Sequence, residues 1–304
     1  MNGLLLIDKP VGLTSFEVVK KVREILKIRK VGHFGSLDPI ATGLLIIALG
    51  KATRLFSFYL NLYKTYRGKI KLGFSTSTYD REGEPVTEEK EVNIKEEEIK
   101  KALRKFEGEQ EQLPPPYSAR KYKGKSLYKY ARAGEKPVLK PKKIKINYIK
   151  LINYFPPYIE FELECSSGTY IRSLAHSIGE YLGVGGHLYS LTRTKIGDFD
   201  LNQALSLDEV EKLSKENKIF EKVIPLEVLL PQFPKVILEE KGAKLALNGN
   251  VVPSSSVLKI IGPKEEIFRL FNVEGRFLAL AKRAKMRRGF QPFIVFRLEE
   301  EREL

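Results

Sequence analysis

Apolar and polar residues alternate along several segments of the chain, as half-buried strands require. In residues 158–165 every second position is apolar with glutamates between, and residues 66–72 alternate in the same way. Short apolar segments bounded by turn residues predict further strands at 3–7 and 144–151. Residues 43–49 are too uniformly apolar for their periodicity to distinguish a buried strand from the start of a helix.

Other segments repeat apolar residues at helical spacing. Residues 18–26 present one apolar face and follow Thr14 and Ser15, either of which can cap a helix. Residues 94–106 include an acidic first turn, which complements the helix dipole, and residues 171–182 show a third amphipathic pattern. The predicted strands are separated by helices, but they do not follow a regular strand–helix–strand succession. This pattern predicts an α+β fold.

The length of the chain and its prolines predict two domains. A chain of 304 residues exceeds what one hydrophobic core usually organises. Pro225, Pro231 and Pro234 predict a linker, and beyond it short strand patterns alternate with turn residues. We therefore expect a large α+β domain at residues 1–230 and a small β-rich domain at residues 234–304.

A net charge of +15 at pH 7 restricts the class of partner. Such a charge favours polyanions, chiefly nucleic acid, although a charged surface also serves solubility. Clustering favours nucleic acid, because residues 118–150 contain twelve Lys or Arg and one acidic residue. Tyrosines beside and among these cations have rings that can stack on unpaired bases.

Several classes of protein do not fit the composition. A single cysteine excludes an internal disulfide framework, and three histidines without ligand spacing argue against a metal site. The longest apolar run, residues 44–49, is far shorter than the roughly 20 residues that span a bilayer, and no secretory leader opens the chain. A likeness to a phosphate loop at residues 43–53 fails on glycine spacing. We expect a cytoplasmic protein that uses no membrane, metal or cofactor.

The segment Gly-His-Phe-Gly-Ser-Leu-Asp-Pro-Ile-Ala-Thr-Gly, residues 32–43, is the sharpest candidate for chemistry. It places Asp38 on a loop rich in small residues, where a carboxylate can approach a ligand without crowding. An aspartate before a proline is also a common entry to a helix, so these residues alone leave a capping role for Asp38 open.

This segment resembles the catalytic motif of the TruB family of tRNA pseudouridine-55 synthases. Further blocks resemble that family in the same order over about residues 3–195, and the tail after Pro234 is similar to a PUA domain. The further blocks are Leu6 to Ser15, Lys64 with Tyr66, Thr78 to Gly83, Pro115 to Tyr128, Gly168 to Leu174, and Leu191 with Arg193.

The resemblance implies a fold and an activity. The fold would be that of pseudouridine synthases, a mixed, largely antiparallel sheet with flanking helices, followed by a small C-terminal β-barrel PUA domain. The activity would be isomerisation of uridine 55 in the T loop of tRNA, on a flipped-out nucleotide and without cofactor. A basic insertion at about residues 108–145 would hold the T arm, and the enzyme would act as a monomer without an obligate protein partner.

The resemblance also implies roles for single residues. Asp38 would be the nucleophile, Arg172 would pair with it, and Tyr66 would lie against the flipped base and take part in deprotonation. Leu191 would form an apolar wall, and His33 would fill the gap that the extruded uridine leaves. The remaining RNA contacts that it implies are Lys9, Asp80, Tyr170, Lys121, Lys123 and Lys125.

Alternatives remain at the level of residues and of function. Phe34 and Ser36 stand where other members often have smaller or more polar residues, and Arg172 could be an ordinary surface charge of its helix. The chain could also be a non-catalytic tRNA-binding or folding chaperone, or a guide-RNA-dependent relative. The presence of Asp38 and Tyr66 together with Arg172 argues against the first, and the basic insertion argues against the second.

Overall fold

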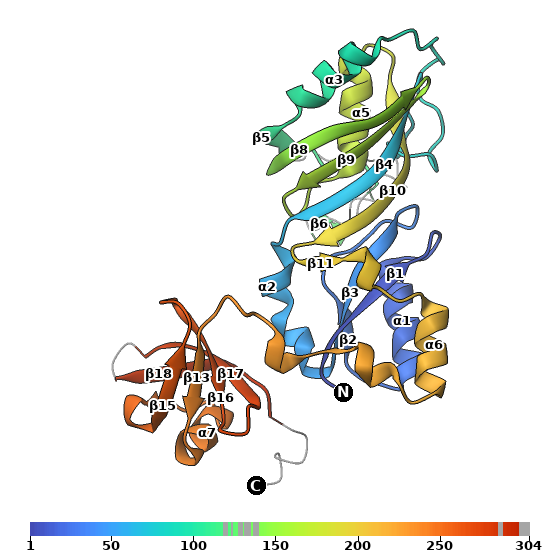
Figure 1. Ribbon diagram of the computed structural model, residues 1–304. Helices are drawn as coiled ribbons and strands as arrows, with labels where there is room; N and C mark the ends of the chain where they lie inside the picture. Colours follow the sequence, from blue (N-terminus) through green and yellow to red (C-terminus); the bar gives the residue numbers. More distant parts are fainter. Residues whose placement is uncertain are drawn as a thin grey trace.

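The computed structural model describes residues 1–117, 121–122, 124–126, 130, 135, 140–284 and 288–297 of the 304-residue chain. Figure 1 shows an elongated unit of sheet and helices, and a smaller β-rich unit at its C-terminal side. Within the described residues, no helix is long and apolar enough to cross a membrane.

One mixed sheet organises the larger unit. Its strands are β1 (Gly3–Lys9), β2 (Val31–His33), β3 (Thr42–Leu49), β4 (Lys64–Leu72), β5 (Gly108–Gln112), β8 (Lys142–Phe155), β9 (Tyr158–Cys165), β10 (Gly186–Ile196), β11 (Phe199–Asp200) and β12 (Ile224–Pro225). The main order is β12-β1-β3-β10-β4-β9-β8-β5, while β2 pairs with β3 and β11 with β10. The described pairs in this sheet are antiparallel except β3 with β10. This mixed, largely antiparallel sheet confirms the expected fold class.

Helices cover each half of this sheet (Figure 1). Helices α1 (Ser15–Leu26) and α6 (Leu207–Lys215) pack on the half that contains β1 and β3. Helices α3 (Glu96–Lys105) and α5 (Ile171–Tyr181) pack on β4, β8 and β9. Of the two cap candidates in the sequence, Thr14 caps α1 by accepting a hydrogen bond from Glu17 N. The short elements of this unit are η1 (Gly50–Leu55), α2 (Phe56–Leu60), β6 (Lys121–Tyr122), β7 (Lys125–Ser126), η2 (Leu201–Gln203), η3 (Ile219–Lys222) and η4 (Leu226–Val228).

The C-terminal unit is a second sheet packed on one helix. Its elements are β13 (Lys235–Leu238), α7 (Glu240–Leu247), β14 (Val252–Pro253), η5 (Ser254–Ser256), β15 (Val257–Ile261), β16 (Ile267–Phe271), β17 (Phe277–Arg283) and β18 (Gly289–Val295). In the described residues the strand order is β14-β18-β17-β16-β13-β15. The curled strands over α7 are consistent with a PUA-like half-barrel.

The two units share a hydrophobic core. One cluster of buried side chains joins Leu4 and Leu6 of β1 to Phe271 of β16 and Phe277 of β17. Arg269 strengthens this junction, because its guanidinium donates to the carbonyl oxygens of two linker residues, Leu229 at 3.1 Å and Phe233 at 2.9 Å. The C-terminal unit therefore completes the packing of the larger unit.

The strand assignment of residues 43–49 is settled by this packing. Strand β3 lies between β1 and β10, and Gly43 to Leu49 are all buried. Its Leu45 and Ile47 face the core under α1, whereas Leu44 and Ile46 face the core shared with the C-terminal unit. A strand covered on both faces has no polar face, which is why its periodicity was uninformative.

Other elements were not predicted by the sequence pattern. Strand β2 precedes the loop that carries Asp38, and the segment after β3 forms η1 and α2. The central strand β10 also lacks a clean alternation, because it buries His187 and Arg193 among its apolar residues.

Candidate active site

The loop that carries Asp38 connects β2 to β3 and is held by α1. Ser15 Oγ accepts a hydrogen bond from Leu37 N at 2.8 Å. The residues after Asp38 form a turn in which Ala41 N donates to Asp38 O at 3.1 Å, and no helix starts there. Asp38 is therefore not a helix cap, and its carboxylate is available for other contacts.

Arg193 of β10 fixes the same loop from inside the protein. Its side chain is buried, with 1% exposed, and its guanidinium donates to three carbonyl oxygens: Leu44 at 2.8 Å, Ser36 at 3.2 Å and Gly35 at 3.0 Å. At Gly43, where φ is +97°, a Cβ would lie 2.4 Å from the Arg193 carbonyl oxygen, so only glycine fits. Residue types do not reveal this role, because the partners of Arg193 are main-chain atoms.

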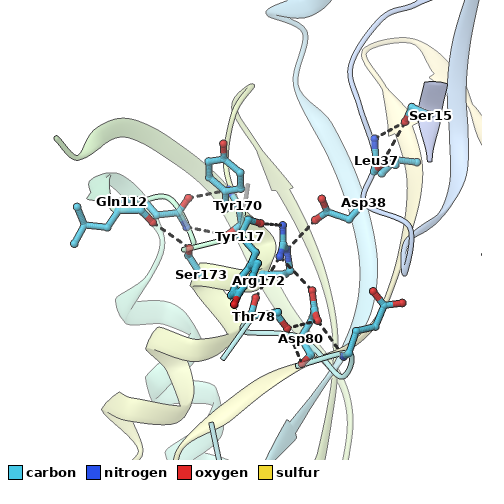
Figure 2. Close-up of polar contacts among 12 residues, drawn as sticks. Ser15, Leu37, Asp38, Thr78, Asp80, Gln112, Tyr117, Tyr170, Arg172 and Ser173 are labelled. Carbon is cyan, nitrogen blue, oxygen red and sulfur yellow. Dashed lines mark hydrogen bonds and ion pairs between the residues drawn. The ribbon is translucent and has the colours of Figure 1, made fainter. Parts of the chain in front are cut away.

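Asp38 forms an ion pair with Arg172 of α5 (Figure 2). Arg172 Nε lies 2.9 Å from Asp38 Oδ2, and Arg172 Nη1 lies 3.2 Å from Asp80 Oδ2. The side chains of Arg172 and Asp80 are 7% and 5% exposed, whereas that of Asp38 is 44% exposed. Arg172 is therefore no surface charge, and Asp38 is the member of this network that a substrate can reach.

Asp80 is held on its other side by its own loop. Its Oδ1 accepts hydrogen bonds from Thr78 Oγ1 at 2.6 Å and from Glu82 N at 3.0 Å. Arg172 donates further to the carbonyl oxygens of Thr78 at 3.2 Å and Tyr117 at 3.0 Å. Carboxylates and carbonyls thus surround the guanidinium and orient it toward Asp38 (Figure 2).

Tyr66 of β4 and Leu191 of β10 form an apolar floor beside the loop. They belong to one buried cluster with Leu37, the residue before Asp38. Burial raises the pKa of Tyr66, while the charge of the Arg193 guanidinium acts in the opposite direction. The Tyr66 hydroxyl therefore keeps its proton at neutral pH.

His33 and Phe34 begin the loop at the end of β2. His33 is half-buried, and its Nδ1 has no hydrogen-bond partner among the described residues. Burial lowers the pKa of His33 from its ordinary 6.5, and the charge of Arg193 lowers it further, so the ring is neutral at pH 7. Phe34 is 1% exposed and stacks on Tyr59 with ring centroids 5.1 Å apart, which absorbs the unusual aromatic residue into the core.

The start of α5 is tied to the base of the basic insertion. Tyr170 N donates to Gln112 Oε1 at 2.8 Å, and Gln112 Nε2 donates back to Tyr170 O at 3.0 Å. Ser173 Oγ donates to Leu113 O at 3.0 Å. The chain thus enters the insertion directly beside Arg172 (Figure 2).

The remaining predicted RNA contacts differ in how far the structure describes them. Lys9 is fully buried, and its ammonium donates to Pro10 O at 2.8 Å, Leu13 O at 2.6 Å and Pro39 O at 3.4 Å. Burial lowers the pKa of Lys9 to about 8. Like the buried Asp80, Lys9 contacts protein groups here, so an RNA contact for either stays a prediction. The side chains of Lys121 and Lys125 and the whole of Lys123 lie outside the described residues.

The described site has the elements of nucleophilic catalysis by a carboxylate. A partly exposed carboxylate is held by a buried cation, beside a phenol and an apolar wall. Within the described ranges, no group of three His, Cys, Asp or Glu side chains is placed to hold a metal ion.

Comparison with known proteins assigns the family. Residues 23–171 match the model of the TruB family pseudouridylate synthase N-terminal domain, and residues 172–231 match the tRNA pseudouridylate synthase B C-terminal domain. The chain belongs to the TruB family. The Asp38 loop, Arg172 and Leu191 all lie within the matched residues.

Relatives in this family match over most of their length. The chain is 48% identical to tRNA pseudouridine synthase B of Aquifex aeolicus (82% of this chain, 86% of the relative) and 44% identical to that of Thermotoga maritima (92% and 90%). It is 41% identical to that of Clostridium tetani (94% and 96%). A solved structure titled as an H/ACA RNP bound to a substrate RNA containing 2'-deoxyuridine superposes with a TM-score of 0.72 and 26% identity, covering 98% of this chain and 86% of that chain. Membership of this family of tRNA-modifying isomerases confirms the expectations of RNA binding and pseudouridine synthesis.

Proposed function

We propose that this protein converts the uridine at position 55, in the T loop of tRNA, to pseudouridine, with Asp38 as the nucleophile. One observation carries the proposal: the half-exposed Asp38 carboxylate lies 2.9 Å from the nearly buried Arg172 Nε. A buried cation keeps such a carboxylate oriented, and partial exposure leaves one of its faces for a substrate.

The reaction suits a site built from ordinary side chains. The N1–C1′ bond of uridine breaks, the detached base turns, and C5 joins C1′. The proton of C5 leaves and N1 takes up a proton, so that the composition of the nucleotide is unchanged and no redox cofactor is required. A carboxylate nucleophile divides one difficult step into two easier ones. The role of Asp38 is to form a transient bond with the nucleotide, and that of Arg172 is to hold the carboxylate in line.

The neighbouring residues fit the handling of a flipped-out base. Leu191 and Tyr66 provide an apolar wall and a ring beside Asp38, and the neutral phenol of Tyr66 is a hydrogen-bond donor. His33, neutral and half-buried at the start of the same loop, has a flat ring that can stack where a uridine has left.

The wider surface fits tRNA as a direct ligand. The net charge of +15 and the cluster of cations at 118–150 favour an RNA backbone. The base of the basic insertion is fixed beside Arg172, which would bring bound RNA to Asp38. Identity of 41–48% to proteins named tRNA pseudouridine synthase B, against 26% to the matched chain of the H/ACA RNP structure, supports a stand-alone enzyme over a guide-RNA-dependent one.

A single assay tests this function. An unmodified tRNA transcript is incubated with the purified protein alone, and pseudouridine is mapped by position. We expect modification at uridine 55 by the wild-type protein and none by Asp38→Asn, which keeps the size of the side chain but removes its charge. Asp38→Asn should lose several orders of magnitude in rate, roughly the scale observed when covalent nucleophiles are removed from other enzymes.

Two results would contradict the proposal. One is pseudouridine at another position, or none, with folded wild-type protein. The other is a near-normal rate for Asp38→Asn protein whose mass excludes deamidation back to aspartate. A protein that refolds misfolded tRNA without forming pseudouridine would instead be the non-catalytic chaperone.

A further inference from the structure

The polar side chains of α5 continue beyond Arg172. Arg172, His176 and Glu180 recur every four residues and therefore line one side of the helix. They contact the long connection between β4 and α3, residues 73–95. Ser75 Oγ in that connection lies 3.2 Å from His176 Nδ1 and donates to Glu180 Oε1 at 3.0 Å.

A serine, a histidine and a glutamate in contact suggest a hydrolytic triad, but the geometry is wrong for one. Ser75 is 1% exposed, so a substrate cannot reach its hydroxyl. Glu180 accepts the hydrogen bond of the Ser75 hydroxyl, so the acid contacts the serine. In a triad the acid instead orients the histidine. The cluster therefore joins the connection to α5.

The ring of His176 makes a second contact with the same connection. It stacks on the ring of Tyr79, with centroids 3.9 Å apart and planes inclined by 5°. Tyr79 has φ +64°, a left-handed conformation that is costly for a residue with a Cβ. It stands between Thr78 and Asp80, and both of these neighbours bind Arg172 through their oxygens. The stack thus holds a strained residue at the centre of the Arg172 binding segment.

We propose that His176 is a positioning residue for the Asp38 site. By stacking on Tyr79 and binding Ser75, it fixes the Thr78–Asp80 segment against α5, and this segment in turn orients Arg172 toward Asp38. In this role His176 acts through Arg172 and needs no contact with Asp38 or with the substrate. The catalytic part of this inference rests on the function proposed above.

Steady-state kinetics with tRNA test the inference. His176→Ala should lower kcat by about 10- to 100-fold, since small misplacements of a catalytic group cost rates of this order. The KM for tRNA should stay within about twofold, because no RNA contact is removed. His176→Phe retains a flat ring for Tyr79 and should recover most of the lost kcat.

A double-mutant cycle asks whether His176 acts through the Arg172 network. In an Asp80→Asn background the segment has already lost its ion pair, so His176→Ala should add little further loss. If the fold decreases in kcat of the two single variants multiply in the double variant, the inference is overturned. An unchanged kcat in folded His176→Ala would overturn it as well. If that variant does not fold, Tyr79→Ala removes the other ring of the stack, and a normal kcat there is equally decisive against it.

Tyr181 provides a control on the same helix. Its ring lies 6.2 Å from that of Phe106, which follows α3, so this contact joins α5 to α3 rather than to the connection at 73–95. Tyr181→Ala should lower the melting temperature but leave kcat within about twofold. A loss of kcat equal to that of His176→Ala would show a general packing effect and overturn the specific role of His176.

Amide hydrogen exchange separates this inference from the proposed function. The amides of residues 75–83 should exchange faster in His176→Ala than in the wild-type protein, while those of β9 stay protected. Unchanged exchange in 75–83 overturns the positioning role, whatever the activity. Wild-type protein that forms no pseudouridine refutes the proposed function, and the exchange comparison still decides whether His176 holds this segment.

Discussion

Arg172 Nη1 lies 3.2 Å from Asp80 Oδ2, and both side chains are nearly buried, although the Asp38 carboxylate that shares Arg172 is half-exposed. One guanidinium therefore serves two carboxylates with different access to solvent. Asp80, which is buried, pairs with the Arg172 guanidinium away from solvent. Asp38, which is exposed, lies where a substrate can reach it. This division explains why the site contains two aspartates but presents only one.

Asp80→Asn should reduce the rate without reducing affinity for tRNA. The change removes a hydrogen-bonded charge worth about 1.5–3 kcal/mol, so Arg172 should be held less well and kcat should fall by about 10- to 100-fold. Single-turnover rates and filter binding of the same tRNA measure the two quantities. Equal losses in both would mean that Asp80 contacts RNA, as the family resemblance implied.

Arg193→Lys should lower the free energy of unfolding more than an Arg→Lys substitution at an exposed position does. Lysine cannot reproduce the fork that binds the Leu44, Ser36 and Gly35 carbonyls, and each buried acceptor left without a partner costs about 1–3 kcal/mol. Urea unfolding measures the difference. Arg67→Lys is the control, because Arg67 pairs with Glu162 on the surface and should change stability by less than about 0.5 kcal/mol.

His33 should contribute a flat ring and not a proton. Because burial lowers its pKa below 6.5, the ring is already neutral at pH 7. His33→Phe keeps a stacking surface and should retain more activity than His33→Ala, with the same dependence of kcat on pH as the wild type. If both variants are inactive although folded, His33 must take part in the chemistry.

The free energy of unfolding should fall as the pH decreases below 6.5. Burial lowers the pKa of His33, His176 and His187 in the folded protein, so between the folded and unfolded pKa values the unfolded chain binds more protons. Above pH 6.5 the histidines are mostly neutral in both the folded and the unfolded state, so they do not make the free energy of unfolding depend on pH. Urea midpoints measured at about pH 7.5 and pH 5.5 test this fall in stability. Both pH values lie above the range near 4.5 in which surface glutamates titrate.

A histidine variant checks the origin of this pH dependence. His187→Phe removes one titrating ring while keeping an aromatic contact for Phe74. Its stability should therefore decrease less steeply with falling pH than that of the wild type. Parallel curves for the two proteins would assign the effect to other groups.

The sequence pattern predicted those strands and helices that bury one face and expose the other. The alternation of Tyr158–Cys165 and the amphipathic face of Ile171–Tyr181 both reflect one covered face and one open face, and both elements were found. Strand β10 was not predicted, because it lies at the centre of the sheet and mixes apolar residues with buried polar ones. Burial of polar groups depends on partners elsewhere in the chain, which local periodicity does not register.

The site was predictable to a similar degree. Asp38 and Arg172 followed from family-like blocks far apart in the chain, and the structure brings them to 2.9 Å. The loop-holding contacts of Lys9 and Arg193 did not follow, because both cations bind backbone carbonyls. Such contacts leave no complementary residue type in the sequence.

The hydrophobic core shared by the two units constrains the order in which the protein can mature during synthesis. Leu4 and Leu6 are synthesised long before Phe271 and Phe277, which belong to the same buried cluster. Until then the nascent chain lacks part of this cluster, and the apolar side chains already made are open to aggregation or chaperone binding. A chain whose synthesis stops before strand β17 would therefore be an aggregation-prone fragment rather than a smaller active enzyme.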